Sequence, residues 1–159
     1  MRSLILIPLL FLSLLLGTNS VKAQDDNECK HGLGVAAGFT TGYGLSYRYI
    51  PKKFGGQLTF APYMDKNRAM YSIGLTFLYR LVENESINLF LYQGNQYYYN
   101  KDKTTNPEDV NKYWNNGIGI GVEFIFQKRF SFNVMGGYAG YENFNSINFT
   151  AETALFFKF

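Results

Sequence analysis

The sequence is poor in the residue types that most catalytic and metal sites require. Its 159 residues include one histidine, His31, and one cysteine, Cys29. A Ser-His-acid site needs a histidine within reach of a serine, and a metal centre needs a cluster of such ligands. His31 precedes the first expected strand and has no fixed partner there. We therefore expect no catalytic residue, no metal site and no cofactor.

A lone cysteine cannot form a disulfide within its own chain. Cys29 follows Asp-Asn-Glu rather than the small and apolar residues typical of a lipoprotein signal, so a free thiol is favoured over a lipid anchor. The sequence also lacks a large excess of positive or negative charge, because its formal net charge is +3. No basic run is interleaved with aromatic residues, so the sequence does not indicate a nucleic-acid partner.

The first residues have the pattern of a secretory signal peptide. A short basic start precedes an apolar run from Leu4 to Leu16, and Val-Lys-Ala follows at the expected cleavage spacing. The apolar run is shorter than the ~20 residues that a membrane-spanning helix needs. We expect cleavage after Ala23, a flexible periplasmic leader over 24–31 and one domain over 32–159.

The rest of the chain lacks a helical period and instead repeats a strand-and-turn unit. Apolar residues alternate with small or polar ones over roughly ten residues, and a turn follows. The expected turns and loops are 40–42, 51–53, 64–68, 82–85, 100–116, 127–129 and 142–146. The pattern predicts an all-β fold, an eight-stranded antiparallel up-and-down β-barrel, because closure leaves no exposed sheet edge.

The two faces of these strands indicate which side meets lipid. The polar face carries many small residues, among them Gly34, Gly38, Ser46, Ser72, Gly74, Gly119, Gly121 and Ser131. Such residues suit a crowded lumen better than a water-exposed surface, so the apolar face should contact a membrane. Aromatic residues near the expected strand ends suit the girdles of a transmembrane barrel: Tyr43, Tyr49, Tyr71, Tyr79, Phe126 and Phe130.

Few charges fall on the polar faces of the strands. They include two arginines and two glutamates that we assign to a polar network in the lumen: Arg48, Arg80, Glu123 and Glu152. Buried charges need partners, which predicts pairing across the lumen. The alternative is that some of them point to solvent near the barrel ends, since the strand register is not fixed by the sequence.

The last strand alternates almost strictly from Ile147 to Phe159. With this strand, the pattern over 32–159 resembles the small eight-stranded outer-membrane β-barrel proteins of Gram-negative bacteria, the OmpA-like and OmpX-like class. The resemblance implies secretion across the inner membrane, insertion into the cell outer membrane and contact with its lipid. It also implies that Phe157 and Phe159 belong to the signal that the outer-membrane insertion machinery reads.

The polar stretch 100–116 is the expected candidate for contact with a surface ligand. Its candidate recognition residues are Asp102, Glu108, Asp109, Tyr113 and Trp114. The alternative is a solvated loop whose aromatic residues rest at the lipid interface.

We expect a non-enzymatic outer-membrane barrel with a structural or surface-interaction role. A general porin is not expected, because side chains fill the interior of an eight-stranded barrel. Two alternatives stay open at this point: a soluble periplasmic lipocalin-like barrel that binds an apolar ligand, and an outer-membrane enzyme that modifies lipid.

Overall fold

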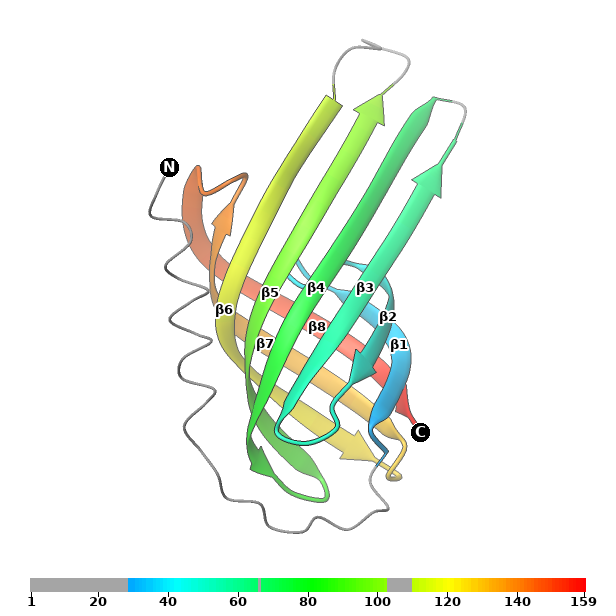
Figure 1. The fold of residues 1–159 in the computed structure, drawn as a ribbon, viewed down its shortest axis with the longest axis vertical. Coiled ribbons are helices and arrows are strands. Elements are labelled where there is room, and N and C mark those ends of the chain that lie inside the picture. The colour runs from blue at the N-terminus through cyan, green and yellow to red at the C-terminus, as the bar shows by residue number, and fades with distance from the viewer. Residues whose placement is uncertain (1–28, 66, 103–109) are drawn as a thin grey trace.

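The computed structural model describes residues 29–65, 67–102 and 110–159, which form a closed barrel. Its strands are β1 (His31–Ala37), β2 (Gly44–Tyr49), β3 (Phe54–Met64), β4 (Arg68–Glu83), β5 (Ile87–Asp102), β6 (Val110–Phe126), β7 (Phe130–Tyr141) and β8 (Ser146–Lys158). Each strand pairs antiparallel with the next, and β8 pairs with β1 (Figure 1). The predicted fold is confirmed. The described residues contain no helix with the length and apolarity to cross a membrane.

The strand register is displaced around the barrel. Stepping from Leu33 on β1 to its paired residue on β2, and so on from strand to strand through β7, ends at Ile147 on β8. In the direct pairing of β1 with β8, however, Leu33 pairs with Phe157. The displacement from 147 to 157 is ten residues. A displacement of this kind requires tilted strands, and eight-stranded barrels typically tilt by about 35–45°.

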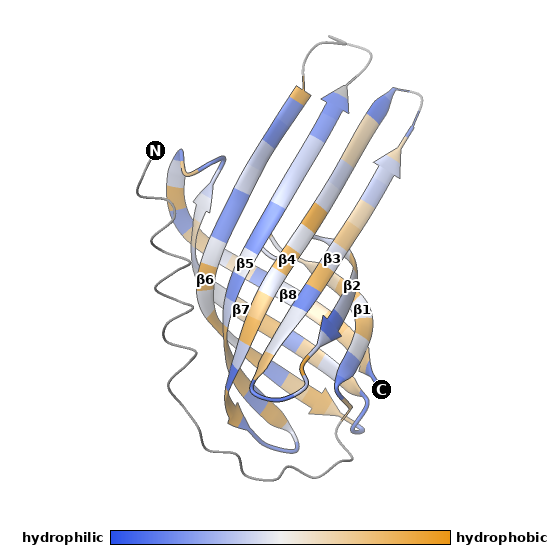
Figure 2. Ribbon diagram, in the orientation of Figure 1, coloured by the Kyte–Doolittle hydropathy of each residue, from blue (hydrophilic) through white to orange (hydrophobic). Residues whose placement is uncertain are grey.

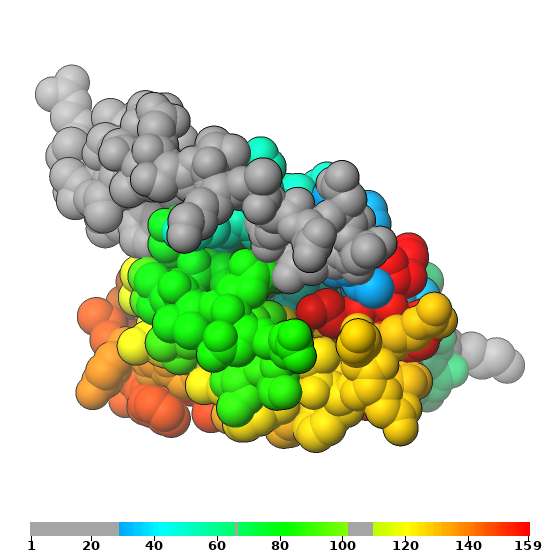
Figure 3. Space-filling model, turned by 90° about the horizontal axis from the view of Figure 1, so that it is seen from below, coloured from blue at the N-terminus to red at the C-terminus, as the bar shows by residue number. Residues whose placement is uncertain are grey.

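The two ends of the barrel differ. One end, here called the turn end, carries the short connections 50–53, 84–86 and 127–129, together with His31 and Phe159. Figure 3 views the molecule from below, where the β4–β5 turn (green), the β6–β7 turn (yellow) and the C-terminal strand (red) meet. The opposite end, here called the loop end, carries the remaining connections, and β3 to β6 rise well beyond β1 and β2 there (Figure 1).

The predicted loop 100–116 is wrong in extent. β5 continues to Asp102 and β6 begins at Val110, so the segment not described, 103–109, separates two long strands. Tyr99 pairs with Lys112, and Lys101 pairs with Val110. Figure 2 shows hydrophilic residues along these outer parts of β5 and β6. Such a stretch has no apolar face, so its sequence lacks the alternation that would mark it as strand.

The barrel buries polar side chains and exposes apolar ones. Gln57, Thr76 and Asn133 are at most 1% exposed, whereas Leu45 is 69% exposed and Ile120 is 53% exposed. Soluble barrels bury their apolar face, so this distribution is the reverse of a soluble one. The polar face fills the lumen and the apolar face forms the outer wall, as the sequence predicted.

Candidate functional site

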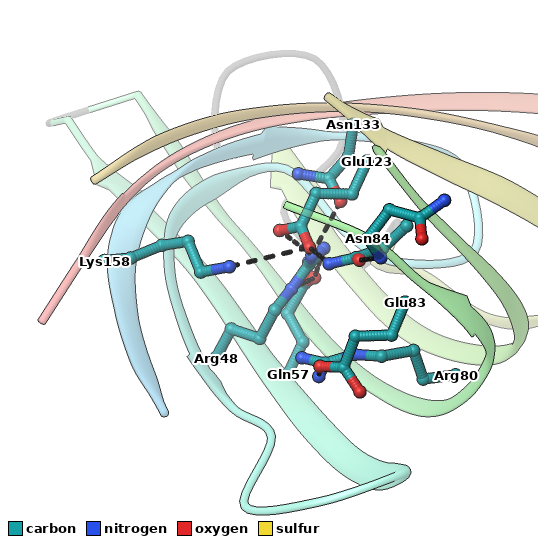
Figure 4. A network of polar contacts seen from close by, with 9 residues as sticks. Arg48, Gln57, Arg80, Glu83, Asn84, Glu123, Asn133 and Lys158 are labelled. Atoms are coloured by element: carbon teal, nitrogen blue, oxygen red, sulfur yellow. Dashed lines mark hydrogen bonds and ion pairs between the residues drawn. The ribbon is translucent and has the colours of Figure 1, made fainter. Parts of the chain in front are cut away.

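The lumen near the turn end holds a buried ionic network centred on Arg48 (Figure 4). Arg48 Nη1 lies 3.6 Å from Glu123 Oε1. The guanidinium donates from Nη1 to Asn133 Oδ1 at 2.6 Å, and from Nη2 to Gln57 Oε1 at 2.7 Å. Residues from β2, β3, β6 and β7 are thus joined across the lumen.

Both charged groups at the centre of this network have further partners. The Arg48 guanidinium lies over the Phe156 ring, 4.2 Å from its centroid. The Glu123 carboxylate accepts a hydrogen bond from Asn88 Nδ2 at 2.7 Å and lies 3.8 Å from Lys158 Nζ. The attraction within a buried ion pair offsets the loss of hydration only when further hydrogen bonds satisfy the remaining polar atoms. The Arg48–Glu123 pair therefore depends on the side chains around it.

Of the other two members of the predicted lumen network, Arg80 lines the same turn-end cavity as Arg48 and Glu123, whereas Glu152 lies apart from them. Arg80 forms an ion pair with Glu83 on its own strand. Glu152 is buried and binds the backbone of the β1–β2 connection, as described below. The structure therefore places Arg48, Arg80 and Glu123 at the same end of the lumen and pairs Arg48 with Glu123, whereas Glu152 lies at the β1–β2 connection.

An apolar layer lies beside the ionic network in the lumen. Leu78, Phe90, Tyr92 and Met135 form one cluster and are each at most 5% exposed. These side chains come from β4, β5 and β7 and point inward between polar neighbours on the same strands. Together with the ionic network, they fill the cross-section of the barrel, as expected for eight strands.

The connection 38–43, here called the inner loop, folds into the lumen instead of standing clear of it. Thr40 and Thr41 are 0% exposed. The Thr40 and Thr41 amides donate to the two carboxylate oxygens of Glu152 at 3.2 and 2.8 Å, and the Thr40 hydroxyl also donates to that carboxylate. A carboxylate that accepts hydrogen bonds from consecutive amides holds the loop firmly, because charged acceptors make the stronger bonds.

The predicted place of Tyr43 in an aromatic girdle is wrong. β2 begins at Gly44, so Tyr43 belongs to the inner loop and its ring lies 6.5 Å from that of Tyr98. The alternation of β2 would place Tyr43 on the outer wall, but β2 begins one residue after Tyr43.

Glycines on the facing strands make room for the inner loop. A Cβ on Gly74 would lie 1.9 Å from the Thr41 carbonyl oxygen, and one on Gly94 or Gly117 would lie 2.8 Å from Thr40. These three glycines belong to β4, β5 and β6. The loop and the glycine-lined wall are therefore complementary in shape.

Replacing Gly74 with alanine should push the inner loop away from β4. The added methyl group meets backbone that cannot rotate aside, so we expect a loss of about 1–3 kcal/mol in the free energy of unfolding. Urea unfolding of the folded barrel in detergent measures this change. The matched control is Gly56→Ala, whose Cβ would lie 3.8 Å from its nearest neighbour. Equal stability of the two variants would contradict the packing described here.

A cavity of about 430 Å³ lies at the loop end, beside the inner loop. Aromatic rings dominate its wall: Phe39, Tyr43, Tyr98 and Tyr113. Tyr98 and Tyr113 stack with ring centroids 4.8 Å apart. The other lining residues include Ala37 and Ala151, which are exposed on the outer wall of the barrel.

The predicted recognition residues do not form one loop. Tyr113 and Trp114 lie in β6 on opposite faces: Tyr113 lines the cavity, whereas Trp114 is 50% exposed and lies 5.1 Å from the Tyr97 ring. Asp102 ends β5. Glu108 and Asp109 lie outside the described residues.

His31 and the predicted assembly residues lie at the turn end, where β1 meets β8. The His31 ring stacks on those of Tyr49 and Phe159, with centroids 4.7 and 5.7 Å apart. The His31 and Phe159 backbones exchange hydrogen bonds of 3.1 and 2.9 Å. Phe157 packs against Phe130 on β7. Across the described parts of the chain, no group of three histidine, cysteine or carboxylate side chains is arranged to hold a metal.

Several residues of the site were not singled out from the sequence. Gln57, Asn88 and Asn133 complete the ionic network, and Thr40 and Thr41 anchor the inner loop. Gln57 lies on the predicted polar face of its strand, which is the signal that could have identified it. The threonine amides are backbone groups, so no side-chain pattern reveals them.

The closed antiparallel sheet, the filled polar lumen and the apolar outer wall define an eight-stranded β-barrel of the outer-membrane type. Among solved structures, the chain is similar to the N-terminal β-barrel domain of Pseudomonas aeruginosa OprF, with a TM-score of 0.58, 16% identity and coverage of 81% of this chain and 94% of that one. It is also similar to Neisserial surface protein A (NspA), with a TM-score of 0.52, 11% identity and coverage of 81% and 93%. No protein-family model and no curated protein matches the sequence.

Proposed function

We propose that the protein is an integral outer-membrane barrel with a non-enzymatic, structural or surface-interaction role. The reversed polarity of the barrel carries this proposal: side chains such as Leu33, Leu58 and Leu155 are 50–56% exposed, which is costly in water and favourable in lipid. The similarity to solved outer-membrane barrels supports it at the level of the fold.

The position of the aromatic side chains gives further support. Near the turn end, the exposed aromatic side chains of the outer wall include Tyr49, Phe54, Phe126, Phe130 and Phe157. Towards the loop end they include Trp114, Tyr138 and Phe149. Two aromatic girdles that bracket an aliphatic band are typical of transmembrane barrels. Short turns face the periplasm in such barrels, so the turn end should be periplasmic and the loop end should face outward.

Extraction of cell membranes with carbonate tests the proposal against a soluble lipocalin-like barrel. An integral barrel stays in the pellet, whereas a soluble periplasmic protein is released. The lipid-modifying alternative has a separate test, which is a comparison of lipid A and phospholipid acyl chains with and without the protein. Release by carbonate would refute the membrane assignment, and altered acyl chains would refute the non-enzymatic role.

Phe159 should promote assembly of the barrel. By resemblance we propose that Phe157 and Phe159 form the signal read by the insertion machinery, and Phe159 also completes the contact with His31. We expect Phe159→Ala to reduce the fraction of folded barrel in the outer membrane several-fold. Phe149→Ala is the matched control, because Phe149 is 65% exposed on the same strand near the loop end. If Phe159→Ala and Phe149→Ala assemble to the same extent, the proposed assembly signal is refuted.

A further inference from the structure

The wall of the barrel is incomplete above the β1–β2 hairpin. β1 pairs with β8 only from Gly32 to Ala37, so residues 146–152 of β8 have no β1 partner. β2 pairs with β3 only as far as Phe60, which leaves residues 61–64 of β3 without a β2 partner. β8 and β3 thus flank a gap at the loop end, here called the notch.

The notch connects the cavity to the lipid-facing wall. Ala37 and Ala151 point outward from β1 and β8 at the notch, and both also line the cavity. Phe39, at the edge of the inner loop, lines the cavity and is 65% exposed. Side chains that belong to the outer wall therefore form one side of the cavity, and the aromatic rings of Tyr98 and Tyr113 form another.

The amide side chains of the cavity wall are already engaged, and the Tyr98 hydroxyl donates to Met70 Sδ at 3.2 Å. Asn115 Nδ2 donates to the Phe39 carbonyl at 2.9 Å and to Gln96 Oε1 at 3.1 Å, and Asn115 Oδ1 accepts from the Glu142 amide at 3.0 Å. Gln96 Nε2 donates to Ser72 Oγ at 2.9 Å. A sugar or peptide would need these donors and acceptors, whereas an apolar ligand needs only the rings.

We propose that the notch admits one acyl chain of an outer-leaflet lipid into the aromatic cavity. This inference rests on the proposed function, since it requires the outer wall to face a bilayer. A volume of about 430 Å³ lies within the range of about 300–1,000 Å³ that ligand sites occupy, and leaves room for one chain rather than a whole lipid. The inner loop forms the floor of this site, and Glu152 holds that floor in place.

Fluorescence quenching by phospholipid brominated on its acyl chains tests the proposal. Trp114 is the only tryptophan, so Trp114→Phe removes the tryptophan fluorescence of the protein before a reporter is added. Three reporters are then compared in vesicles: Tyr98→Trp in the cavity, Val134→Trp on the outer wall and Tyr92→Trp in the filled lumen. We expect Tyr98→Trp to lose fluorescence to an extent comparable with Val134→Trp, and Tyr92→Trp to lose little. Tyr113→Trp is a second cavity reporter if Tyr98→Trp does not fold.

A blocking variant tests the route. Ala151→Phe narrows the notch and should return quenching of Tyr98→Trp to the level of Tyr92→Trp. Ala69→Phe, on β4 and away from the cavity, is the matched control and should leave the quenching unchanged. Quenching that persists with Ala151→Phe would overturn access through the notch.

The outcomes separate this inference from the proposed function. If Val134→Trp is quenched and the cavity reporters are not, the barrel lies in the bilayer and the acyl-chain site is refuted. If Val134→Trp itself is not quenched, the membrane assignment fails. If a brominated free fatty acid quenches the cavity reporters but brominated phospholipid does not, the ligand comes from solution and lateral access from the leaflet is refuted.

Discussion

Replacing Arg48 with methionine should lower the free energy of unfolding of the barrel by about 3–5 kcal/mol. Arg48 is 4% exposed, and its removal takes away the nearer of the two cationic groups that pair with the buried Glu123 carboxylate, at 3.6 Å against 3.8 Å for Lys158. It also removes the donors that satisfy Gln57 and Asn133. Urea unfolding in lipid vesicles, followed by circular dichroism, measures the loss.

Two further variants distinguish the ion pair from general damage to the lumen. Adding Glu123→Gln to Arg48→Met removes the uncompensated charge and should recover part of the lost stability. Lys52→Met replaces an exposed lysine in the β2–β3 turn and should change stability by less than about 0.5 kcal/mol. If Arg48→Met alone were as mild as Lys52→Met, the ionic network would not be a main source of stability.

Glu152→Ala should raise the hydrogen-exchange rates of the Thr40 and Thr41 amides on the order of 100-fold. Both amides are buried and donate to the Glu152 carboxylate. A buried donor left unpaired costs about 1–3 kcal/mol, and each 1.4 kcal/mol is about a factor of ten in an equilibrium constant. Exchange measured by NMR spectroscopy in detergent micelles resolves the two amides directly.

The controls for this prediction use a conservative variant and a distant site. Glu152→Gln retains one acceptor oxygen and should give an intermediate increase. Glu85→Ala removes an exposed carboxylate in the β4–β5 turn and should leave both threonine amides protected. Protection that survives Glu152→Ala would mean that packing against the glycine-lined wall, rather than the carboxylate, holds the inner loop.

The barrel could be predicted from the sequence because its signal is local. Alternation places Leu45 on the outer wall and Arg48 in the lumen without any knowledge of their neighbours in space, and short polar breaks mark the turns. The same alternation fails where a strand has no apolar face. In β5, Gln93 and Asn95 both lie on the outward face and hydrogen-bond to each other at 2.9 Å, so they interrupt the pattern there.

The inner loop could not be predicted, because its position depends on contacts that are distant in the chain. Thr40 and Glu152 are 112 residues apart. The sequence Thr-Thr-Gly reads equally well as a turn that stands in solvent. The glycines that receive the loop lie on three other strands, and each one alone suits an ordinary crowded lumen. The inner-loop partners of Glu152 were likewise hidden, because they lie more than 100 residues away in the chain.

Gel mobility of the detergent-extracted outer-membrane fraction, heated against unheated, tests the central claim most directly. A closed barrel with a lipid-facing wall should be found in that fraction and should migrate differently before and after heating, because detergent alone does not open it. A protein recovered in the soluble periplasm without a heat-dependent shift would contradict the account, and its exposed apolar wall would then need a different explanation.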